Sequence, residues 1–204
     1  YRLDGTARMR QRPVGSLVEA LRSLGAMVEF HDREGFPPLT VHAEHLRGGE
    51  VLMDASVSSQ FVSALMLAAP CAGDDVFLEL LPPVVSRPYL DMTTRVMDAF
   101  GVSVIAQATG ATGVTTSAEN KTPSHRPTSE DRAKIIIPAP QRYEARVYPI
   151  EPDASNACYF LAAPAVAGGR VTVKGLTSAS IQGDASFTRV LEMLGCGVES
   201  HAEG

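Results

Sequence analysis

Three polar residues, Ser58, Ser59 and Gln60, stand directly before an apolar helical run in the stretch DASVSSQFVSALMLAAP (residues 54–70). Backbone N–H groups and the macrodipole at a helix N-terminus favour an anion, and adjacent hydroxyls add hydrogen-bond donors. This serine cluster therefore suits a phosphate, with Gln60 able to reach a neighbouring carbonyl or carboxylate. Ordinary N-capping is the alternative, and it needs only one of these residues. From the residues alone, both interpretations stay open.

The same frame returns 99 residues later without the serine cluster. The stretch DASNACYFLAAP (residues 153–164) repeats Asp-Ala-Ser and a Phe seven residues after the Asp. Ala157, Cys158 and Tyr159 stand where the first copy has its three polar residues. The repeat therefore predicts one scaffold used twice, with the polar site on the first copy only.

A second candidate anion site is the segment ARMRQRP, which places Arg8, Arg10 and Arg12 at alternate positions. If this segment is extended, all three guanidinium groups point to one side and concentrate positive charge. A solvated basic turn before a helix at Val14 is the alternative.

A third candidate is the segment SRPY, in which Ser86 and Tyr89 flank Pro88 at a predicted helix start. Their hydroxyls suit contacts with a polyol ring, and Arg87 adds charge. Stabilisation of the local loop explains this stretch equally well.

Other chemistries find no support in the residues. The histidines share no metal-ligand spacing, and Asp153 and Asp184 are interpreted as helix caps. Walker A, GxGxxG and GxSxG motifs are absent, so nucleotide binding and acyl-enzyme chemistry have no foothold.

Composition restricts the class of protein. The chain has 204 residues, 45% of them hydrophobic and 20% charged, which is typical of an ordinary globular protein. A net charge of −5 argues against nucleic-acid binding through broad basic attraction. The widely spaced Cys71, Cys158 and Cys196 lie in apolar contexts, which predicts three reduced, buried thiols and a cytoplasmic protein. We expect no membrane segment, since no stretch approaches eighteen apolar residues.

Internal repeats define the organisation of the chain. TRVMDAFG (94–101) matches TRVLEMLG (188–195), and VFLELL (76–81) matches VTVKGL (171–176). Periodicity predicts strand, helix, strand, helix and then paired strands, so the fold class is α/β, built from βαβαββ units. A Leu17–Leu24 stripe predicts a further helix that Gly25 ends, followed by a hairpin. For the helix after GGEVLMDAS, Asp54 and Ser56 are the N-cap candidates.

Two boundaries interrupt this pattern. Residues 107–132 carry few large apolar side chains and many Thr, Ser, Gly and Pro, which predicts an exposed inserted loop. A full repeat ends before YPIEPDAS, so a hinge is expected around Tyr148–Pro152. The predicted domains are therefore residues 1–148, about two repeat units, and residues 149–204, about one.

Four motifs, LDGTARMRQRP, DASVSSQF, SRPYLDMT and EPDASNACYFLAA, together closely resemble the EPSP synthase (3-phosphoshikimate 1-carboxyvinyltransferase) family. The resemblance spans nearly the whole chain in the right order, except residues 107–132. SVSSQF is the most specific motif. The sister UDP-N-acetylglucosamine enolpyruvyl transferases share the repeats but lack the serine pair, and they use a loop cysteine that has no counterpart here.

The resemblance implies two domains of the enolpyruvyl transferase fold, joined by a hinge and closing on substrate. It implies transfer of the enolpyruvyl group of phosphoenolpyruvate to the 5-hydroxyl of shikimate 3-phosphate, in aromatic amino-acid biosynthesis, with no metal or organic cofactor. Glyphosate is the implied inhibitor and a monomer the implied state. The implied contacts are Ser58, Ser59, Gln60, Ser86 and Tyr89 to shikimate 3-phosphate, and Arg12, Gln60 and Arg8 to phosphoenolpyruvate.

The family's general base and most of its phosphoenolpyruvate ligands have no match in this chain. We therefore expect an internal fragment without catalytic residues of its own, inactive when isolated. The alternatives are another enolpyruvyl transferase with a different acceptor and a non-catalytic anion-binding scaffold.

Overall fold

The computed structural model describes residues 1–42, 45–54, 58–82, 87–107, 133–177 and 179–201. The chain divides into two compact units, Tyr1–Glu144 and Ala145–Gly204. This division lies a few residues before the hinge that the repeats predict. It stays a prediction that the two units are domains of a larger enzyme.

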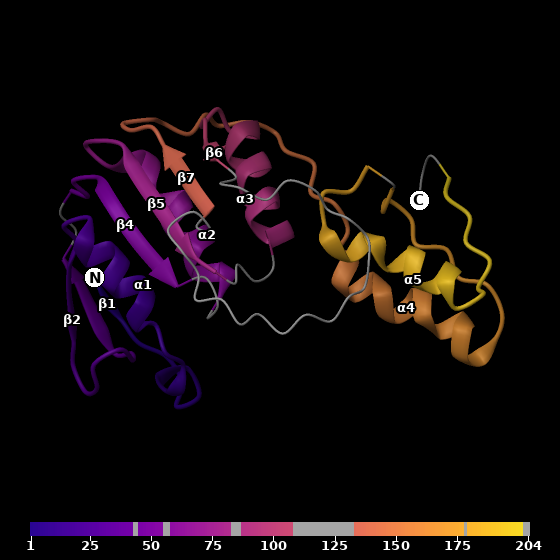
Figure 1. Ribbon diagram of the computed structural model, residues 1–204. Helices are drawn as coiled ribbons and strands as arrows, with labels where there is room; N and C mark the ends of the chain where they lie inside the picture. Colours follow the sequence, from indigo (N-terminus) through magenta and orange to yellow (C-terminus); the bar gives the residue numbers. More distant parts are fainter. Residues whose placement is uncertain (43–44, 55–57, 83–86, 108–132, 178, 202–204) are drawn as a thin grey trace, which may run out of the picture. The chain divides into compact units, whose positions relative to one another are not determined.

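Unit 1 contains most of the regular structure (Figure 1). Its helices are η1 (Met9–Gln11), α1 (Gly15–Ser23), α2 (Ser59–Ala68), η2 (Ala69–Cys71) and α3 (Arg87–Ala99). Its strands are β1 (Arg2–Leu3), β2 (Met27–Phe30), β3 (Leu39–His42), β4 (Gly49–Asp54), β5 (Val76–Leu81), β6 (Ile105–Gln107) and β7 (Ala133–Ile137).

One complete βαβαββ unit runs from β4 to β7. Its sheet has the order β4-β5-β7-β6, in which β4 and β5 are parallel and the other neighbours are antiparallel. The elements follow in the chain order β4, α2, β5, α3, β6 and β7, as the periodicity predicts. The α/β fold class and the repeat unit are therefore confirmed.

The elements before β4 form the end of a similar unit. β1, β3 and β2 make a separate antiparallel sheet, with β3 in the centre. Leu24 closes α1, and Gly25 follows with φ +93°, a left-handed conformation that glycine adopts without strain. The predicted helix, glycine stop and hairpin are confirmed.

Helices α1, α2 and α3 pack in a row and share one hydrophobic core with the four-stranded sheet. Val62, Leu65 and Met66 of α2 are fully buried in this core, together with Met97 of α3. On its other side α1 packs through Val18 against β2 and β3. The buried face of α2 is thus packed against the sheet and against the two neighbouring helices.

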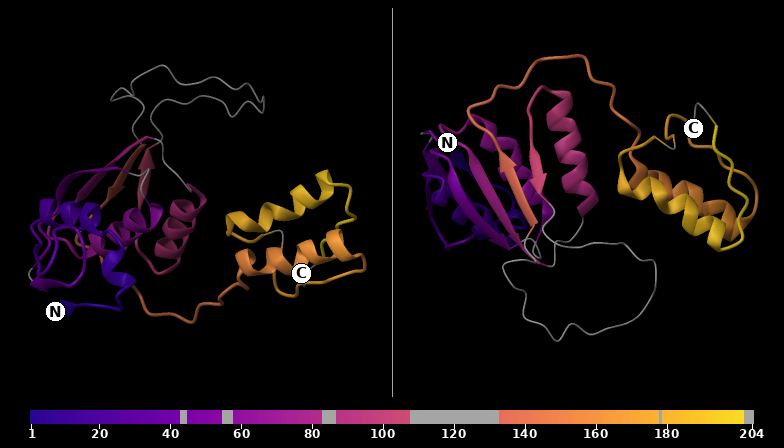
Figure 2. Two further views of the ribbon diagram at one scale, coloured as in Figure 1. Left: turned by 90° about the horizontal axis from the view of Figure 1, so that it is seen from below. Right: turned by 45° about the horizontal axis from the view of Figure 1, so that its top comes forward.

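Unit 2 contains α4 (Ala154–Ala167), η4 (Gly183–Ser186) and α5 (Phe187–Met193). In Figures 1 and 2, α4 and α5 lie side by side. They correspond by sequence to α2 and α3. The second strand predicted by the repeat, residues 171–176, is not formed, and the described part of this unit contains no strand. A strand needs a hydrogen-bonded neighbour, and the segment before α4 carries Pro149 and Pro152, which lack an N–H donor.

No helix in the described part of the chain is long and apolar enough to cross a membrane.

Candidate functional site

The candidate site lies at the carboxyl edge of the parallel strands β4 and β5. Asp54 at the end of β4 pairs with Leu81 at the end of β5, so both strands finish at one level. Helices α2 and α3 each follow one of these strands, and their N-termini therefore lie at the same edge, the lower end of the four-stranded sheet in Figure 1. In open α/β sheets, ligands bind at the carboxyl ends of parallel strands.

Ser58 is the N-cap of α2. Its backbone is extended (φ −169°, ψ 125°), and its Oγ accepts a hydrogen bond from the backbone N–H of Gln60 at 3.2 Å. The prediction of Asp54 or Ser56 as cap is wrong, because β4 continues through Asp54; Ser56 lies outside the described residues. Ser59 and Gln60 are the first two residues of α2, so the serine cluster occupies its first turn.

Polar groups in this first turn can meet an anion. Ser58 and Ser59 are half-buried, and Gln60 is exposed. The first N–H groups of a helix have no partner within the helix, and they carry the positive end of the macrodipole. A phosphate placed here would receive hydroxyl donors together with backbone donors.

The second copy begins its helix one turn earlier. Asp153 caps α4, and its carboxylate accepts from the backbone N–H of Asn156 at 3.1 Å, so this predicted cap is confirmed. Cys158, which matches Ser59, is the fifth residue of α4, beyond its first turn. The two copies therefore differ in helix start as well as in side chains.

Tyr89 is the third residue of α3 and is 46% exposed. Pro88 lies in the first turn of the helix, as predicted. Ser86, the other hydroxyl of this segment, lies outside the described residues. The structure thus brings Tyr89 and the serine cluster to the same edge of the sheet on neighbouring helices.

The arginine segment is not extended, so the condition for a one-sided array of three guanidinium groups is not met, and the alternative of a turn before the helix is the one that forms. Met9–Gln11 form the 3₁₀ helix η1, which Arg8 precedes and Arg12 follows. Arg10 is used locally, because its guanidinium makes two hydrogen bonds of 2.8 and 2.7 Å to the carboxylate of Asp4. These bonds lower the pKa of Asp4.

Arg8 and Arg12 remain available to a ligand. Both are exposed, and no carboxylate of the described residues lies within ion-pair distance of either guanidinium. Figure 1 shows the indigo segment that contains η1 at the lower end of unit 1, below the tips of the β4 and β5 arrows. Two of the three arginines are therefore available to an anion, and their use at the candidate site is a proposal.

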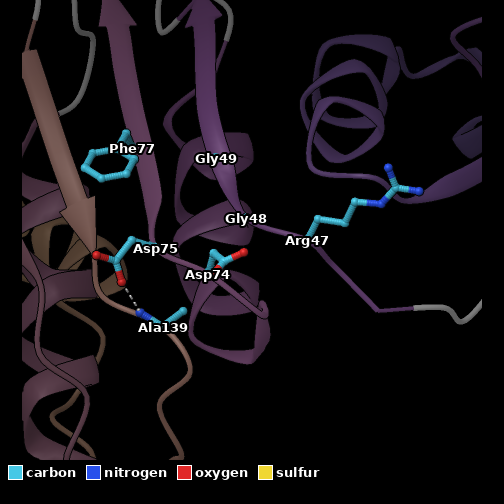
Figure 3. A pocket seen from close by; sticks show the side chains of 7 residues that line it. All are labelled: Arg47, Gly48, Gly49, Asp74, Asp75, Phe77 and Ala139. Carbon is cyan, nitrogen blue, oxygen red and sulfur yellow. Dashed lines mark hydrogen bonds between the residues drawn. The ribbon is translucent and has the colours of Figure 1, made fainter.

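An open hollow of about 450 Å³ lies at the opposite, amino end of β4 and β5 (Figure 3). It is lined by Arg47, Gly48, Gly49, Asp74, Asp75, Phe77 and Ala139. The carboxylate of Asp75 accepts from the backbone N–H of Ala139 at 2.9 Å, and Arg47 points away from both aspartates. We assign the hollow no ligand, because its mixed charges converge on no common point.

The cysteines depart from the prediction of buried thiols. All three are free, but Cys71 is exposed, and Cys158 and Cys196 are half-buried. Partial burial, with a smaller contribution from Asp184, raises the pKa of Cys158. Asp184 is not a helix cap as predicted; it lies within η4 and accepts a hydrogen bond from the hydroxyl of Ser155.

Sequence reasoning missed a polar network in unit 2. The carboxylate of Glu151 accepts from the hydroxyl of Ser180 at 2.6 Å and from the amide of Gln182 at 3.0 Å. The Gln182 carbonyl oxygen accepts from Ala154 N–H at 2.9 Å, so the network also ties down the start of α4. The partners in this network lie about 30 positions apart in the sequence. They belong to no repeated motif, so no local sequence pattern predicts that they meet.

Among the described residues, no group of three or more His, Cys, Asp or Glu side chains is arranged to hold a metal ion.

Comparisons with known proteins agree with this α/β repeat fold. The EPSP synthase (3-phosphoshikimate 1-carboxyvinyltransferase) family model matches residues 1–129 and 126–204. The chain therefore belongs to the EPSP synthase family.

Three similar relatives carry the name 3-phosphoshikimate 1-carboxyvinyltransferase. The Sulfurovum sp. (strain NBC37-1) protein is 41% identical over 200 residues, 98% of this chain. The Nostoc sp. (strain PCC 7120) protein is 42% identical over 203 residues, 100% of this chain. The Vibrio cholerae (strain M66-2) protein is 40% identical over 200 residues, 98% of this chain. The chain spans 42% of the length of each of these curated relatives.

A solved structure, EPSP synthase from Acinetobacter baumannii, superposes with a TM-score of 0.62 at 18% identity. The match covers 95% of this chain and 37% of that one. At this identity the likeness confirms the fold alone.

Proposed function

We propose that the chain supplies the shikimate 3-phosphate cradle and part of the phosphoenolpyruvate site of an EPSP synthase. The complete enzyme transfers the enolpyruvyl group of phosphoenolpyruvate to the 5-hydroxyl of shikimate 3-phosphate and releases phosphate. The observation that carries the proposal is the position of the serine cluster, in the first turn of α2 at the carboxyl edge of β4 and β5.

In this proposal the 3-phosphate of the substrate lies at the N-terminus of α2. Ser58 and Ser59 donate their hydroxyls to it, and Ser58 can do so while its Oγ still accepts from Gln60 N–H. Hydrogen bonds to a charged group contribute about 1.5–3 kcal/mol each. Tyr89, exposed on the neighbouring helix, contacts the same substrate, and Ser86 joins it on the strength of the SRPY motif alone.

Phosphoenolpyruvate is proposed to lie beside Arg12, with Gln60 nearby and Arg8 as a weaker contact. A guanidinium group binds carboxylate or phosphate through two parallel hydrogen bonds, and Arg12 has no described carboxylate to compete for it. The general base is proposed to lie outside these 204 residues. The chain's own groups therefore bind and orient, and proton transfer belongs to the remainder of the enzyme.

Further properties are proposed from family membership. The complete enzyme is a cytoplasmic monomer that needs no metal or organic cofactor, and glyphosate inhibits it. The free state of all three thiols supports a reducing compartment.

Two alternatives make different predictions about the acceptor. A different enolpyruvyl transferase would use another hydroxyl compound, such as a UDP-sugar, and a non-catalytic scaffold would bind an anion without turnover. The SVSSQF motif and the family match support shikimate 3-phosphate over both.

The test uses a full-length chimaera, in which residues 1–204 replace the matching segment of the Vibrio cholerae relative. Phosphate release is measured with phosphoenolpyruvate and either shikimate 3-phosphate or UDP-N-acetylglucosamine. We expect turnover with shikimate 3-phosphate only, and a fall of at least tenfold in kcat/KM for Ser58→Ala with Ser59→Ala. Cys158→Ala, the matched change in the second copy, should leave kcat/KM within twofold. Turnover with the UDP-sugar, or equal damage from both copies, would overturn the proposal.

A further inference from the structure

Two hydroxyl groups connect α2 and α3 one turn inside the candidate site. Ser63 Oγ and Thr93 Oγ1 lie 2.8 Å apart, and both residues are half-buried. Thr93 Oγ1 also donates to the backbone carbonyl of Tyr89 at 2.8 Å. The two helices pack side by side along this contact (Figure 1).

The direction of this chain of hydrogen bonds follows from proton counting. A hydroxyl has one proton to donate. Thr93 uses its proton on the Tyr89 carbonyl, so Ser63 must donate to Thr93 Oγ1. The bonds therefore run from α2, through Thr93, to the residue of α3 that is proposed to contact substrate.

Ser63 lies inside helix α2, and its hydroxyl bonds to the neighbouring helix α3. A serine inside a helix can donate to the carbonyl four residues earlier, as Ser23 of α1 does to Glu19 at 2.9 Å. For Ser63 that carbonyl would belong to Ser59. Ser63 donates to Thr93 of α3 instead. Its hydroxyl therefore joins the two helices rather than bonding to a backbone carbonyl of α2.

The positions of Ser63 and Thr93 connect this hydrogen-bonded bridge between the helices to the candidate site. Ser63 stands four residues after Ser59, and Thr93 stands four residues after Tyr89, so each lies one helical turn behind a proposed substrate contact. Residues at this spacing lie on one helix face. A shift of α3 along α2 at the bridge would therefore move Tyr89 relative to the serine cluster by a similar amount.

We propose that Ser63 and Thr93 are positioning residues, which fix the spacing between the serine cluster and Tyr89 so that both contact one shikimate 3-phosphate. This inference rests on the proposed function. Neither residue touches the substrate; both act through the turns that do.

The test compares Thr93→Val with Thr93→Ser in the full-length chimaera. Valine keeps the shape of threonine and removes the hydroxyl, whereas serine retains it. We expect Thr93→Val to raise KM for shikimate 3-phosphate about three- to tenfold, with kcat and KM for phosphoenolpyruvate within twofold. Thr93→Ser should restore KM to within twofold. Thr94→Val, the same change at the next residue of α3, is the matched control and should have no effect.

A second comparison separates positioning from general loosening of the helices. In a Tyr89→Phe background, Thr93→Val should add less than a twofold change in KM, because the contact that it positions is already lost. A full additional loss there would overturn the inference, as would an unchanged KM for Thr93→Val alone. KM for shikimate 3-phosphate in two further variants tests the site itself. If both Tyr89→Phe and the variant that carries Ser58→Ala with Ser59→Ala leave this KM unchanged, the proposed site is wrong, and so is the inference.

Discussion

Ser58 has two roles in this account, helix cap and phosphate ligand, and substitutions can separate them. Its Oγ accepts the Gln60 N–H at 3.2 Å, and its hydroxyl proton is proposed to point at the substrate phosphate. Asn and Asp cap helices about as well as Ser, whereas Ala does not cap. Asp and Asn have nearly the same shape, so they differ at this position in charge alone.

The magnitudes follow from these roles. Loss of the cap in Ser58→Ala should cost about 1 kcal/mol of unfolding free energy. A carboxylate about 4 Å from a phosphate, at an effective dielectric of about 20, is repelled by about 4 kcal/mol per pair of unit charges. Ser58 is half-buried, so we halve this value for screening by solvent. About 2 kcal/mol of lost binding corresponds to roughly thirtyfold in affinity.

Each variant of the full-length chimaera is assayed by urea unfolding and by KM for shikimate 3-phosphate. We expect Ser58→Asn and Ser58→Asp to unfold within about 0.5 kcal/mol of each other, and Ser58→Ala to lose about 1 kcal/mol. KM for Ser58→Asp should exceed that for Ser58→Asn at least tenfold. Equal KM values for Asp and Asn would refute the reasoning, since no phosphate could then lie beside residue 58.

Two further predictions concern stability and pH. Gly48 and Gly49 both have positive φ, at +98° and +114°. A Cβ on Gly48 would lie 2.2 Å from the Asp74 carbonyl oxygen, whereas no atom lies within 4 Å of a Cβ on Gly49. Both Ala variants should carry about 1–3 kcal/mol of backbone strain, and Gly48→Ala should lose about 2 kcal/mol more in urea unfolding; equal losses would show that the clash relaxes freely. The hydroxyl of Ser180, followed by Gln182, lowers the pKa of Glu151 below its ordinary value of 4.5. Ser180→Ala should raise that pKa in an NMR titration of the Glu151 carboxyl carbon. Because the folded pKa is depressed, the stability lost in this variant should be largest above pH 4.5 and vanish as pH falls through the folded value, and a pKa that does not move would contradict the assignment.

The repeated α/β frame was predictable because it depends on periodicity. In β4, Val51 and Met53 are buried while Leu52 is exposed, the alternation of a strand with one covered face. Gly25 ends α1 where the sequence predicts. Patterns of this kind are local, and tertiary packing reinforces them.

The start of α2 was not predictable in the same way. Asp54, Ser56 and Ser58 are all good capping residues, spaced two apart, and local preference does not separate them. Pairing of β4 with β5 extends the strand through Asp54 and so moves the helix start beyond it. A contact with a distant strand decided the cap.

The arginine segment does not form a strand, and the reason is a set of local hydrogen bonds that the alternating pattern does not reveal. Thr6 Oγ1 accepts from the backbone N–H of Met9 at 3.4 Å, and its carbonyl accepts from that of Arg10 at 3.1 Å. Together with the Asp4–Arg10 ion pair at 2.7 Å, these bonds turn the backbone. The alternate spacing suggested that three arginines share one face of a strand. Short-range hydrogen bonds form a turn instead, and in that turn Arg10 pairs with Asp4.

The most direct test of the central claim is a crystal structure of the full-length chimaera with shikimate 3-phosphate. We expect phosphate oxygens within about 3 Å of the Ser58 and Ser59 hydroxyls, at the N-terminus of α2, with Tyr89 in contact with the same molecule. A phosphate bound at the start of α4, or in the hollow beside Asp74 and Asp75, would contradict the central claim.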